Sequence, residues 1–487
     1  MSRSDVAART WQASIGGVLR AAGDGATYQT VDPTTEEVLA AVPQCTAADI
    51  DAAVAGAHDV QRDWAALAPR ARAGRVREFA ALLRAHAAEL AMLDALDAGL
   101  PVTAMKTDVA FAAEYLEIMC DLALGLGGQT IPATGEHLHY TVREPFGVVA
   151  RIVPYNHPLF FSAAKLAPPL VAGNAVILKA PDQAPLSALR IGELAQQVLP
   201  PGLVSAVSGS GQVTGRALVR HPAIRRIGFI GSGGTGRAIQ RDAAETGVKE
   251  VSLELGGKNA MIVCSDADPL AAAAGAVNGM NFATTAGQSC GSTSRLLVHE
   301  SLAEEVIKHV VAGLEAITVG DPADGSTEMG PLITAGHRDR VAALIQTARD
   351  EGADLVTGGG RPAAVTERGY FLAPTVLAGV APDSTLATTE VFGPVLAVLT
   401  FRDEAEAVRI ANAVPFGLTG AVWTADVRRA HRLARSLEAG YIWVNGSARH
   451  FWGVPFGGVK DSGIGREESL EELQSFTTLK SVNVLLG

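Results

Sequence analysis

Apolar residues recur at helical spacing along most of the first 140 residues. The runs Ala47–Leu67, Ala71–Ala95 and Val109–Leu126 place apolar side chains three and four positions apart, which is the spacing of a single helix face. We therefore predict that this part of the chain is mostly helical.

From Gly147 onward the pattern changes to short β-rich runs that alternate with alanine-rich helical runs. Most of the short runs are followed by a turn of Gly, Pro, Asn or Ser and then by a helix, which is typical of βαβ units in a parallel sheet. The predicted strands are Val148–Val153, Ala175–Lys179, Leu203–Val207, Arg226–Ile230 and Glu250–Leu255.

A second alternating region begins at Met261, after the twin glycines of Glu254–Lys258 interrupt the pattern. Two further runs, Gln129–Arg143 and Phe476–Leu486, look like strands outside both regions, and we expect them to pair with each other or across a subunit contact. The predicted strands of the second region are Met261–Val263, Ser294–His299, Val395–Phe401, Thr419–Thr424 and Gly440–Val444.

The composition indicates a compact chain without nucleic-acid or membrane partners. Of the 487 residues, 48% are hydrophobic and 19% are charged, which is ample material for a core. The net charge of −11 includes no block rich in Lys and Arg, which argues against nucleic acid and anionic membranes. The sequence shows neither a secretory leader nor an apolar stretch of ~18 residues, so we expect a cytoplasmic protein.

The four cysteines, Cys45, Cys120, Cys264 and Cys290, form no CxxC pair and have no histidine at metal-ligand spacing. We therefore expect neither a disulfide framework nor a metal site. Only Cys290 has small neighbours on both sides, within Gly287–Ser292. That setting favours an accessible nucleophile beside backbone N–H groups that can point at a bound oxygen, whereas the other three are typical of buried small side chains.

A glycine-rich turn follows the predicted strand Arg226–Ile230. Gly231, Gly233 and Gly236 fit the pattern GxGxxG, which lets a backbone approach a pyrophosphate at the start of a helix. The same pattern also occurs in ordinary strand-to-helix turns. Glu254 follows at about the distance expected of a ribose ligand, but its two glycine neighbours expose the carboxylate equally well for a general base.

Asn156 stands between Pro154 and Pro158 at the end of the first predicted strand of its region. Open α/β sheets bind ligands at this edge, and the Asn156 amide could donate a hydrogen bond to a developing oxyanion. A simple turn-forming asparagine is the alternative.

Taken together, these segments resemble the aldehyde dehydrogenase superfamily over essentially the whole chain. The resemblance rests on separated motifs that occur in the family's order: Pro154–Pro158, Lys179–Asp182, Phe229–Gly236, Glu254–Lys258, Gly287–Cys290, Glu390–Val395, Asn445 and Pro455–Glu467. It implies NAD(P)-dependent oxidation of an aldehyde to a carboxylic acid.

The resemblance implies a catalytic role for five residues. Cys290 would attack the aldehyde carbon, and the Asn156 amide together with the Cys290 N–H would hold the oxyanion. Glu254 would act as the base for the thiol or the hydrolytic water, rather than as a ribose ligand. Lys165 and Glu467 would carry protons away from Glu254.

The resemblance also implies a dinucleotide site. Lys179 and Asp182 would bind the adenosine ribose, although the family more often has Glu at the second position. NAD is favoured because Asp182 would repel a 2′-phosphate, while Lys179 leaves NADP possible. The other implied contacts are Gly211, Gly231, Ser232 and Gly236 on the phosphate side and Glu390 and Phe392 on the nicotinamide side.

By the same resemblance, one stripe of the helix Val109–Leu126 faces a substrate tunnel, although plain core is the alternative. An apolar tunnel favours an aromatic or medium-chain aliphatic aldehyde, but Arg449 and His450 could grip the carboxylate of a semialdehyde. The implied substrate residues are Tyr115, Met119, Leu122, Tyr155, Phe456, Arg449 and His450.

The implied fold is α/β in three parts. Residues 1–126 and 145–254 form a Rossmann-like parallel-sheet cofactor domain, and residues 255–455 form a second α/β catalytic domain. Residues 127–144 and 456–487 form a small β element that bridges subunits of a homodimer or homotetramer.

Three other functions stay open. A CoA-acylating relative would release the acyl group to CoA, but it would not need Glu254 as a base. A catalytically silent binding or structural relative would have no need for Cys290, Glu254 and Asn156 together. A cysteine hydrolase using Cys290 with His157 or His299 would have no use for the glycine turn.

Overall fold

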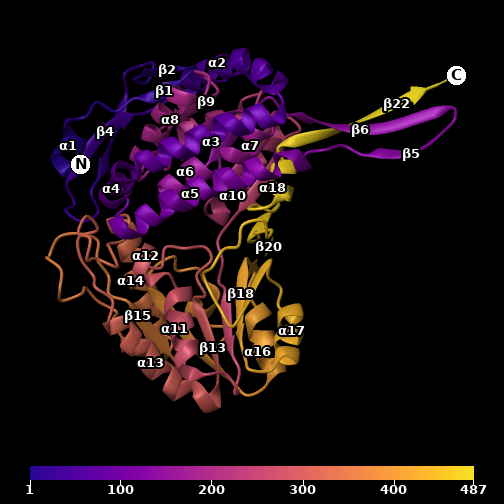
Figure 1. The fold of residues 1–487 in the computed structure, drawn as a ribbon. Helices are drawn as coiled ribbons and strands as arrows, with labels where there is room; N and C mark the ends of the chain where they lie inside the picture. The colour runs from indigo at the N-terminus through magenta and orange to yellow at the C-terminus, as the bar shows by residue number, and fades with distance from the viewer. Residues whose placement is uncertain (487) are drawn as a thin grey trace.

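The computed structural model describes residues 1–486. Two α/β units lie one above the other, and a long β-ribbon projects from one side of the first unit (Figure 1). No helix within residues 1–486 has both the length and the apolar character needed to cross a lipid bilayer.

The first unit is built around an eight-stranded sheet whose five central strands are parallel. Four of these strands, β7, β8, β9 and β10, are buried along their full length, as expected for a sheet covered on both faces. The predicted strands are confirmed. The order is β2 (Val18–Arg20), β1 (Ala13–Ile15), β9 (Val204–Val207), β8 (Ala175–Lys179), β7 (Val148–Ile152), β10 (Arg226–Ile230), β11 (Glu250–Glu254) and β21 (Gly463–Ile464).

Helices cover this sheet, and the N-terminal region is mostly helical as predicted, although it differs from the expectation in two places. The segment Ala71–Ala95 is not one helix, because the chain leaves helical geometry at His86, where φ is −101° and ψ is 15°. The first 43 residues hold four strands, including the hairpin of β3 (Thr27–Val31) and β4 (Val38–Pro43). The helices of this unit are α1 (Arg3–Ala8), α2 (Ala47–Ala66), α3 (Pro69–Ala85), α4 (Ala87–Asp97), α5 (Val102–Leu122), α6 (Pro158–Ala164), α7 (Ala167–Val171), α8 (Leu186–Val198), α9 (Arg216–Arg220), α10 (Gly233–Thr246) and α18 (Leu470–Gln474).

The second unit holds a seven-stranded sheet that is parallel except for its edge strand β14. Five of its strands match the predicted ones, while β14 and β15 were not predicted. The order is β14 (Asp354–Thr357), β15 (Thr375–Ala378), β16 (Val395–Phe401), β13 (Arg295–His299), β12 (Ala260–Val263), β18 (Thr419–Trp423) and β19 (Tyr441–Val444). Its helices are α11 (Pro269–Gly279), α12 (Phe282–Thr285), α13 (Ala303–Glu315), α14 (Ala335–Asp350), α15 (Thr385–Thr388), α16 (Glu404–Asn412) and α17 (Val427–Ser436).

The projecting ribbon contains the two strands predicted outside the sheets. β6 (His137–Pro145) pairs antiparallel with β22 (Thr477–Leu485) along its whole length, from Thr477 opposite Pro145 to Leu485 opposite His137. β5 (Thr130–Thr134) pairs with the other edge of β6. The two strands therefore pair with each other, although residues 456–476 lie outside this ribbon.

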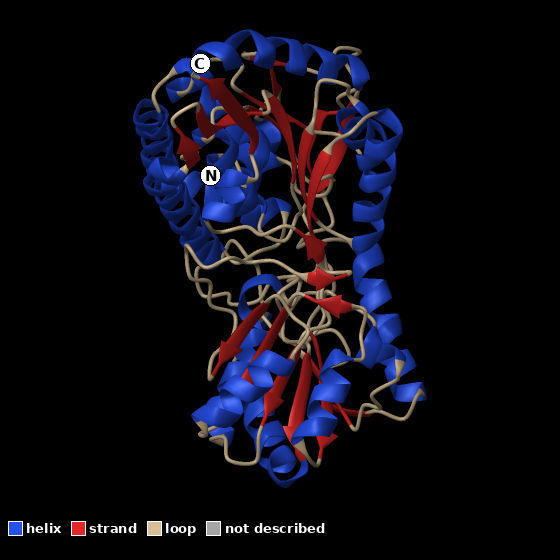
Figure 2. Cartoon of the chain, turned by 90° about the vertical axis from the view of Figure 1, so that its right-hand side faces the viewer, coloured by secondary structure: helices blue, strands red, loops and turns tan. Residues whose placement is uncertain are grey.

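The two sheets have separate hydrophobic cores. The chain passes directly from one to the other through residues 255–259, because β11 ends at Glu254 and β12 begins at Ala260. This arrangement brings the carboxyl ends of the first sheet's strands towards the amino ends of the second sheet's strands (Figure 2).

Candidate active site

A cavity of about 930 Å³ lies where the two sheets meet. Its wall combines residues that follow the strands of the first sheet with residues that precede the strands of the second. Of the predicted site residues, Tyr155, Asn156, Lys179, Asp182, Gly211, Gly231, Ser232, Glu254, Cys290, Glu390 and Phe392 line it. Side chains from positions far apart in the sequence thus share one space.

Asn156 comes from the turn between β7 and α6. Pro158 occupies the first turn of α6, where a missing N–H costs nothing and the fixed φ favours the helix. The Asn156 side chain is only 3% exposed and lines the cavity together with Cys290. It is therefore a preorganised amide at the carboxyl edge of the sheet.

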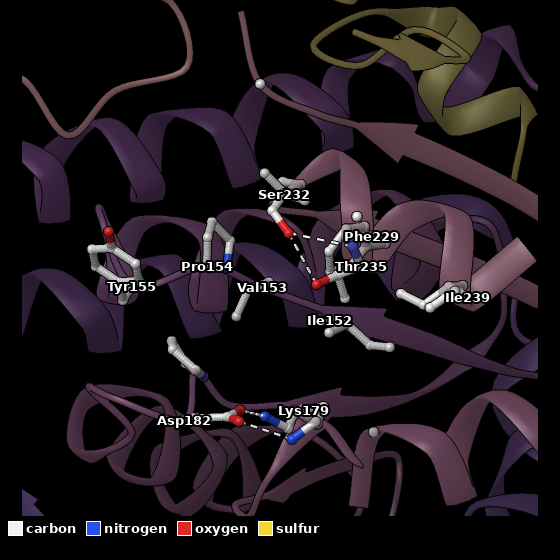
Figure 3. A pocket seen from close by; sticks show the side chains of 18 of the residues that line it. Ile152, Val153, Pro154, Tyr155, Lys179, Asp182, Phe229, Ser232, Thr235 and Ile239 are labelled. Carbon is white, nitrogen blue, oxygen red and sulfur yellow. Dashed lines mark hydrogen bonds and ion pairs between the residues drawn. The ribbon is translucent and has the colours of Figure 1, made fainter. Parts of the chain in front are cut away.

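Lys179 and Asp182 form an ion pair at the end of β8 (Figure 3). The second Asp182 oxygen accepts a hydrogen bond from the Gly211 N–H at 2.8 Å, so the pair joins the ends of two neighbouring strands. Burial lowers the pKa of the Lys179 ammonium, and the Asp182 charge works against this change. The pair presents one cation and one carboxylate to the cavity.

The glycine turn between β10 and α10 has the close contacts that its pattern predicts. Ser232 caps α10, accepting a hydrogen bond from the Thr235 N–H at 3.3 Å (Figure 3). A methyl group on Gly236 would come within 2.8 Å of Leu255, so this glycine lets α10 pack closely on the sheet. The start of α10 consequently directs free backbone N–H groups towards the cavity.

Glu254 ends β11, and its side chain is 5% exposed. Neither carboxylate oxygen has a hydrogen-bond partner within residues 1–486. Burial raises the pKa of Glu254 well above its usual range; the charge of Glu467 adds to this effect and Lys165 opposes it. An unpartnered buried carboxyl with a raised pKa is suited to accepting and releasing a proton near neutral pH.

Cys290 lies in the loop before β13 and is half-buried, while the other three cysteines are buried. Asn259 holds this loop, because its amide donates to the carbonyl oxygens of Cys290 at 2.7 Å and Ser292 at 2.8 Å. Burial raises the pKa of the Cys290 thiol to about 12, with further contributions from the charges of Glu390 and Glu254. The resting thiol is therefore protonated and needs a base.

Glu390 and Phe392 lie on a loop clamped at several points. The Gly257 N–H donates to Glu390 at 2.9 Å, and a methyl group on Gly256 would collide with the same carboxylate at 2.0 Å. Phe392 has a left-handed backbone with φ of 55°, a strained geometry that clusters at functional sites. The His337 ring forms a hydrogen bond with the carbonyl oxygen of Phe392 at 2.7 Å.

Sequence reasoning missed three residues of this site. His337 and Arg340 line the cavity, and Arg340 donates to the carbonyl oxygen of Val391 at 2.5 Å. Asn259 positions the Cys290 loop. Each acts on backbone atoms that lie at least 31 positions away in the chain, and no local pattern marks such a contact.

Lys165 and Glu467 lie behind the cavity wall. Lys165 Nζ is 3.0 Å from Glu467 Oε2, and Arg151 donates to Glu467 Oε1 at 2.9 Å. Both cations lower the pKa of the Glu467 carboxyl, against the effect of burial. The predicted pair is therefore in contact, within a larger group of buried charges.

Of the seven predicted substrate residues, one lies in the cavity wall and six do not. Tyr155 lines the cavity, with its ring edge-on to Phe392 at 6.0 Å. Tyr115 and Met119 differ from the expectation: both are 0% exposed, because their stripe of α5 faces the core of the first unit. The Tyr115 hydroxyl donates a hydrogen bond to the Glu472 carboxylate and does not face the cavity.

The other four predicted substrate residues are also absent from the cavity wall. Leu122 is half-buried against the first core, and Phe456 is buried in the second core. His450 bonds the Glu468 carboxylate at 2.9 Å. Arg449 is exposed, and its guanidinium lies 5.0 Å from the centre of the Phe451 ring.

Comparisons with known proteins agree with this geometry. A sequence profile described as the aldehyde dehydrogenase family matches residues 20–482. The chain is 45% identical to aldehyde dehydrogenase tropH of Talaromyces stipitatus over 94% of this chain and 90% of that one. It is 40% identical to betaine aldehyde dehydrogenase of Rhizobium etli over 95% of each chain.

A similar solved structure is the NAD⁺ complex of aldehyde dehydrogenase from Bacillus cereus. It superposes with a TM-score of 0.96 at 37% identity, covering 99% of this chain and 98% of that one. The similarity therefore extends across both sheets and the cavity between them.

Proposed function

This chain belongs to the aldehyde dehydrogenase family, and on that premise we propose that it oxidises an aldehyde to the carboxylic acid through a thioester on Cys290. One observation carries the proposal. A thiol, an unpartnered carboxyl and a buried amide line one cavity with the residues suited to a dinucleotide.

The first proposed step joins the Cys290 sulfur to the aldehyde carbon. Glu254 takes the thiol proton, directly or through a water molecule, because the thiol is protonated at neutral pH. The carbonyl oxygen becomes an oxyanion, and the Asn156 amide and the Cys290 N–H donate to it. One preorganised donor of this kind contributes roughly 3 kcal/mol to the transition state.

The second step removes a hydride from the tetrahedral carbon and leaves a thioester on Cys290. Glu254 passes the thiol proton on to solvent before water attacks the thioester. Glu254 then accepts a proton from that water, the bond between sulfur and carbon breaks, and the departing Cys290 thiolate takes the proton back from Glu254 as the carboxylic acid is released. The net change consumes one aldehyde and one water and releases one acid and one proton, while one hydride, which carries two electrons and one proton, would pass to the bound cofactor. Dividing the oxidation in this way separates one difficult step into two easier ones.

The residues of the cavity fit NAD. The Lys179–Asp182 pair supplies a cation and a carboxylate to ribose hydroxyls, and the start of α10 supplies N–H groups to a pyrophosphate. Glu390, whose carboxylate occupies the space left by Gly256, would hold the second ribose. When bound, the dinucleotide supplies the hydride acceptor.

The cofactor site can be tested apart from the chemistry. Lys179→Met removes the cation but keeps the stem of the side chain. We expect the KM for NAD to rise about tenfold with kcat nearly unchanged, since one hydrogen bond to a charged group contributes about 1.5 kcal/mol. An unchanged KM would exclude Lys179 from the cofactor site, and NADP measured in parallel tests whether Asp182 sets the preference.

For the substrate, we propose an aromatic or medium-chain aliphatic aldehyde. Two aromatic side chains of the cavity wall, Tyr155 and Phe392, lie edge to face at 6.0 Å. Arg449 supports a semialdehyde as the second candidate, because it is exposed and makes no ion pair within residues 1–486. A carboxylate on the substrate would supply that partner.

The main experiment follows cofactor absorbance with aromatic, aliphatic, semialdehyde and betaine aldehyde substrates. Wild type is compared with Cys290→Ala, with and without CoA. Reduction by wild type alone, without CoA, supports a hydrolytic dehydrogenase, and the rank order of substrates separates the two candidate classes. Turnover only with CoA would exclude hydrolysis, and no turnover with any aldehyde would favour a silent relative.

We also propose that the ribbon of β5, β6 and β22 mediates a homodimer or homotetramer. Both outer strands have free edges, and Ile131, Leu479 and Leu485 expose apolar side chains there. Light scattering on the full chain should give a mass of two or four subunits. A monomer at micromolar concentration would contradict this assignment.

A further inference from the structure

A group of buried charged residues lies behind Glu254, and we call it the charge cluster. It consists of Arg151 at the end of β7, Lys165 at the end of α6, Glu467, and Glu472 on α18, with Tyr115 of α5 bonded to it. Every member is at least nine-tenths buried. The family resemblance implies a proton-carrying role for Lys165 and Glu467 but none for Glu472.

Glu472 is tied to both cations and to the phenol. Its Oε2 is 3.5 Å from Lys165 Nζ, and its Oε1 is 3.6 Å from Arg151 Nη2. The Tyr115 hydroxyl donates to Oε2, and Lys165 Nζ donates to the same hydroxyl at 3.2 Å. Lys165 therefore contacts Glu472 both directly and through Tyr115.

Glu254 adjoins the cluster through the backbone. A methyl group on Gly457 would come within 2.8 Å of Glu254 Oε1, so the carboxyl lies against this segment. The next residue back, Phe456, exchanges two backbone hydrogen bonds with Glu467, at 2.9 and 2.7 Å. The Glu254 carboxyl is therefore separated from the Glu467 residue only by the backbone of the Phe456–Gly457 segment.

Counting charges in this space gives an imbalance. Two cations, Arg151 and Lys165, make ion pairs with two carboxylates. Glu254 adds a third carboxyl that makes no ion pair within residues 1–486, although the charge of Arg466 acts to lower its pKa, against the effect of burial. Because unpaired buried charge is costly, one of the three carboxyls retains a proton. Glu467 lies closer to both cations, at 2.9 and 3.0 Å, than Glu472 does, at 3.6 and 3.5 Å, so Glu467 is the ionised one and the proton belongs to Glu254 or Glu472.

Two other charged groups near Glu472 have their own partners. Arg226 of β10 is buried against the Phe476 ring and donates to neutral oxygens of Ser475, Ser252 and its own strand. Burial lowers the pKa of Arg226, and the more distant charges of Glu467 and Glu472 work against this effect. Glu468 pairs with His450. Neither group forms an ion pair with Glu472 within residues 1–486.

We propose that Glu472 is a positioning residue that sets the protonation of Glu254, so that the two carboxyls share one proton across the Lys165–Glu467 pair. When Glu472 is ionised, its charge keeps the proton on Glu254. When Glu472 is protonated, the two cations balance Glu467 and Glu254, and Glu254 is free to act as a base. This inference rests on the proposed role of Glu254.

Glu472→Gln tests it, because glutamine keeps the shape and the hydrogen bonds but removes the charge. Removing that charge favours the ionised form of Glu254 and lowers its pKa. The acidic limb of kcat/KM, which reports groups of the free enzyme, should move to lower pH by roughly one unit. Activity below the wild-type midpoint should rise accordingly.

The matched control is Glu471→Gln, which removes an exposed carboxylate from the same helix. Its limb should coincide with that of the wild type. If Glu472→Gln also leaves the limb in place, the proposal is overturned. If Glu472→Gln does not fold, Tyr115→Phe replaces it: losing the phenol donor raises the pKa of Glu472, so the limb should shift in the same direction by less.

A second readout separates this inference from the proposed function. Infrared spectra record the protonated-carboxyl stretch of Glu254 against pH, assigned by its loss in Glu254→Gln, and need no turnover. A band that titrates at lower pH in Glu472→Gln supports the shared proton. If Glu254→Gln oxidised aldehydes as fast as the wild type, Glu254 would not be the base of the reaction. The infrared test of the shared proton would still hold, because it does not depend on turnover.

Discussion

The two parallel sheets contribute to the cavity from opposite ends of their strands. In the first sheet the site residues follow the strands: Asn156 after β7, Asp182 after β8 and Ser232 after β10. In the second sheet they precede the strands: Cys290 before β13 and Glu390 before β16. The rule that α/β sheets bind ligands at the carboxyl edge therefore describes only one half of this site.

The two edges also differ in how the site residues are held in place. At the carboxyl edge, each site residue enters a turn or a helix that fixes it, as Ser232 does by capping α10. At the amino edge, the loops need outside support. Asn259 holds the Cys290 loop, and Arg340 and His337 hold the loop of Phe392. Asn156 and Ser232 in the first half are fixed locally, although Asp182 also accepts a hydrogen bond from the distant Gly211 N–H. The second half is fixed by contacts between distant residues.

The largest expected effect lies in the first half. Asn156→Ala removes the proposed oxyanion donor without disturbing β7 or α6. We expect kcat to fall by roughly 100- to 1,000-fold, measured by cofactor absorbance, while NAD binding measured by fluorescence stays within twofold. A kcat within threefold of the wild type would remove Asn156 from the reaction.

A smaller effect is expected from a support in the second half. Asn259→Ala deprives the carbonyls of Cys290 and Ser292, and the Thr419 N–H, of their partner. Unsatisfied buried groups of this kind lower the free energy of unfolding by about 1–3 kcal/mol, measured by urea denaturation.

Asn278→Ala, an exposed change on α11, is the control for that measurement and should stay within about 0.5 kcal/mol of the wild type. Equal stability of the two variants would show that the Cys290 loop does not depend on Asn259.

The smallest expected effect concerns Glu390 and Cys290, which lie on two different loops at the amino edge of the second sheet. Glu390 is the first charge raising the pKa of Cys290, so Glu390→Gln lowers that pKa. The thiolate fraction at pH 8 should rise, and alkylation of Cys290 by iodoacetamide should become about three- to tenfold faster. In both proteins the rate should increase with pH, because pH 8 lies below the pKa of about 12.

Glu315→Gln, which ends the surface helix α13, should leave the alkylation rate unchanged. If Glu390→Gln behaved in the same way, the two loops would be electrostatically independent.

The same difference between the sheets explains what could be predicted from the sequence. The strands of the first sheet and the turns after them are local patterns, so Asn156, Glu254 and the glycine turn stood out. Cys290 was marked by its small neighbours. Glu390 and Phe392 had no local signal and came only from the resemblance.

Other features depend on packing that no local pattern records. The spacing of Tyr115 and Met119 fits a helix stripe, but spacing alone does not distinguish a core from a tunnel. The contacts of His337, Arg340 and Glu472 join distant parts of the chain. The strands β1 and β2 were missed because strands of three residues carry little periodicity.

The charge cluster also bears on how the protein is made. Arg151 and Lys165 are synthesised more than 300 residues before Glu467 and Glu472. A ribosome adds roughly 5–20 residues per second, so both cations leave it many seconds ahead of their partners. Burying them during that interval would leave two charges uncompensated. The first sheet therefore reaches its final packing only after the second sheet has been synthesised, and the earliest strands must wait for the last helix.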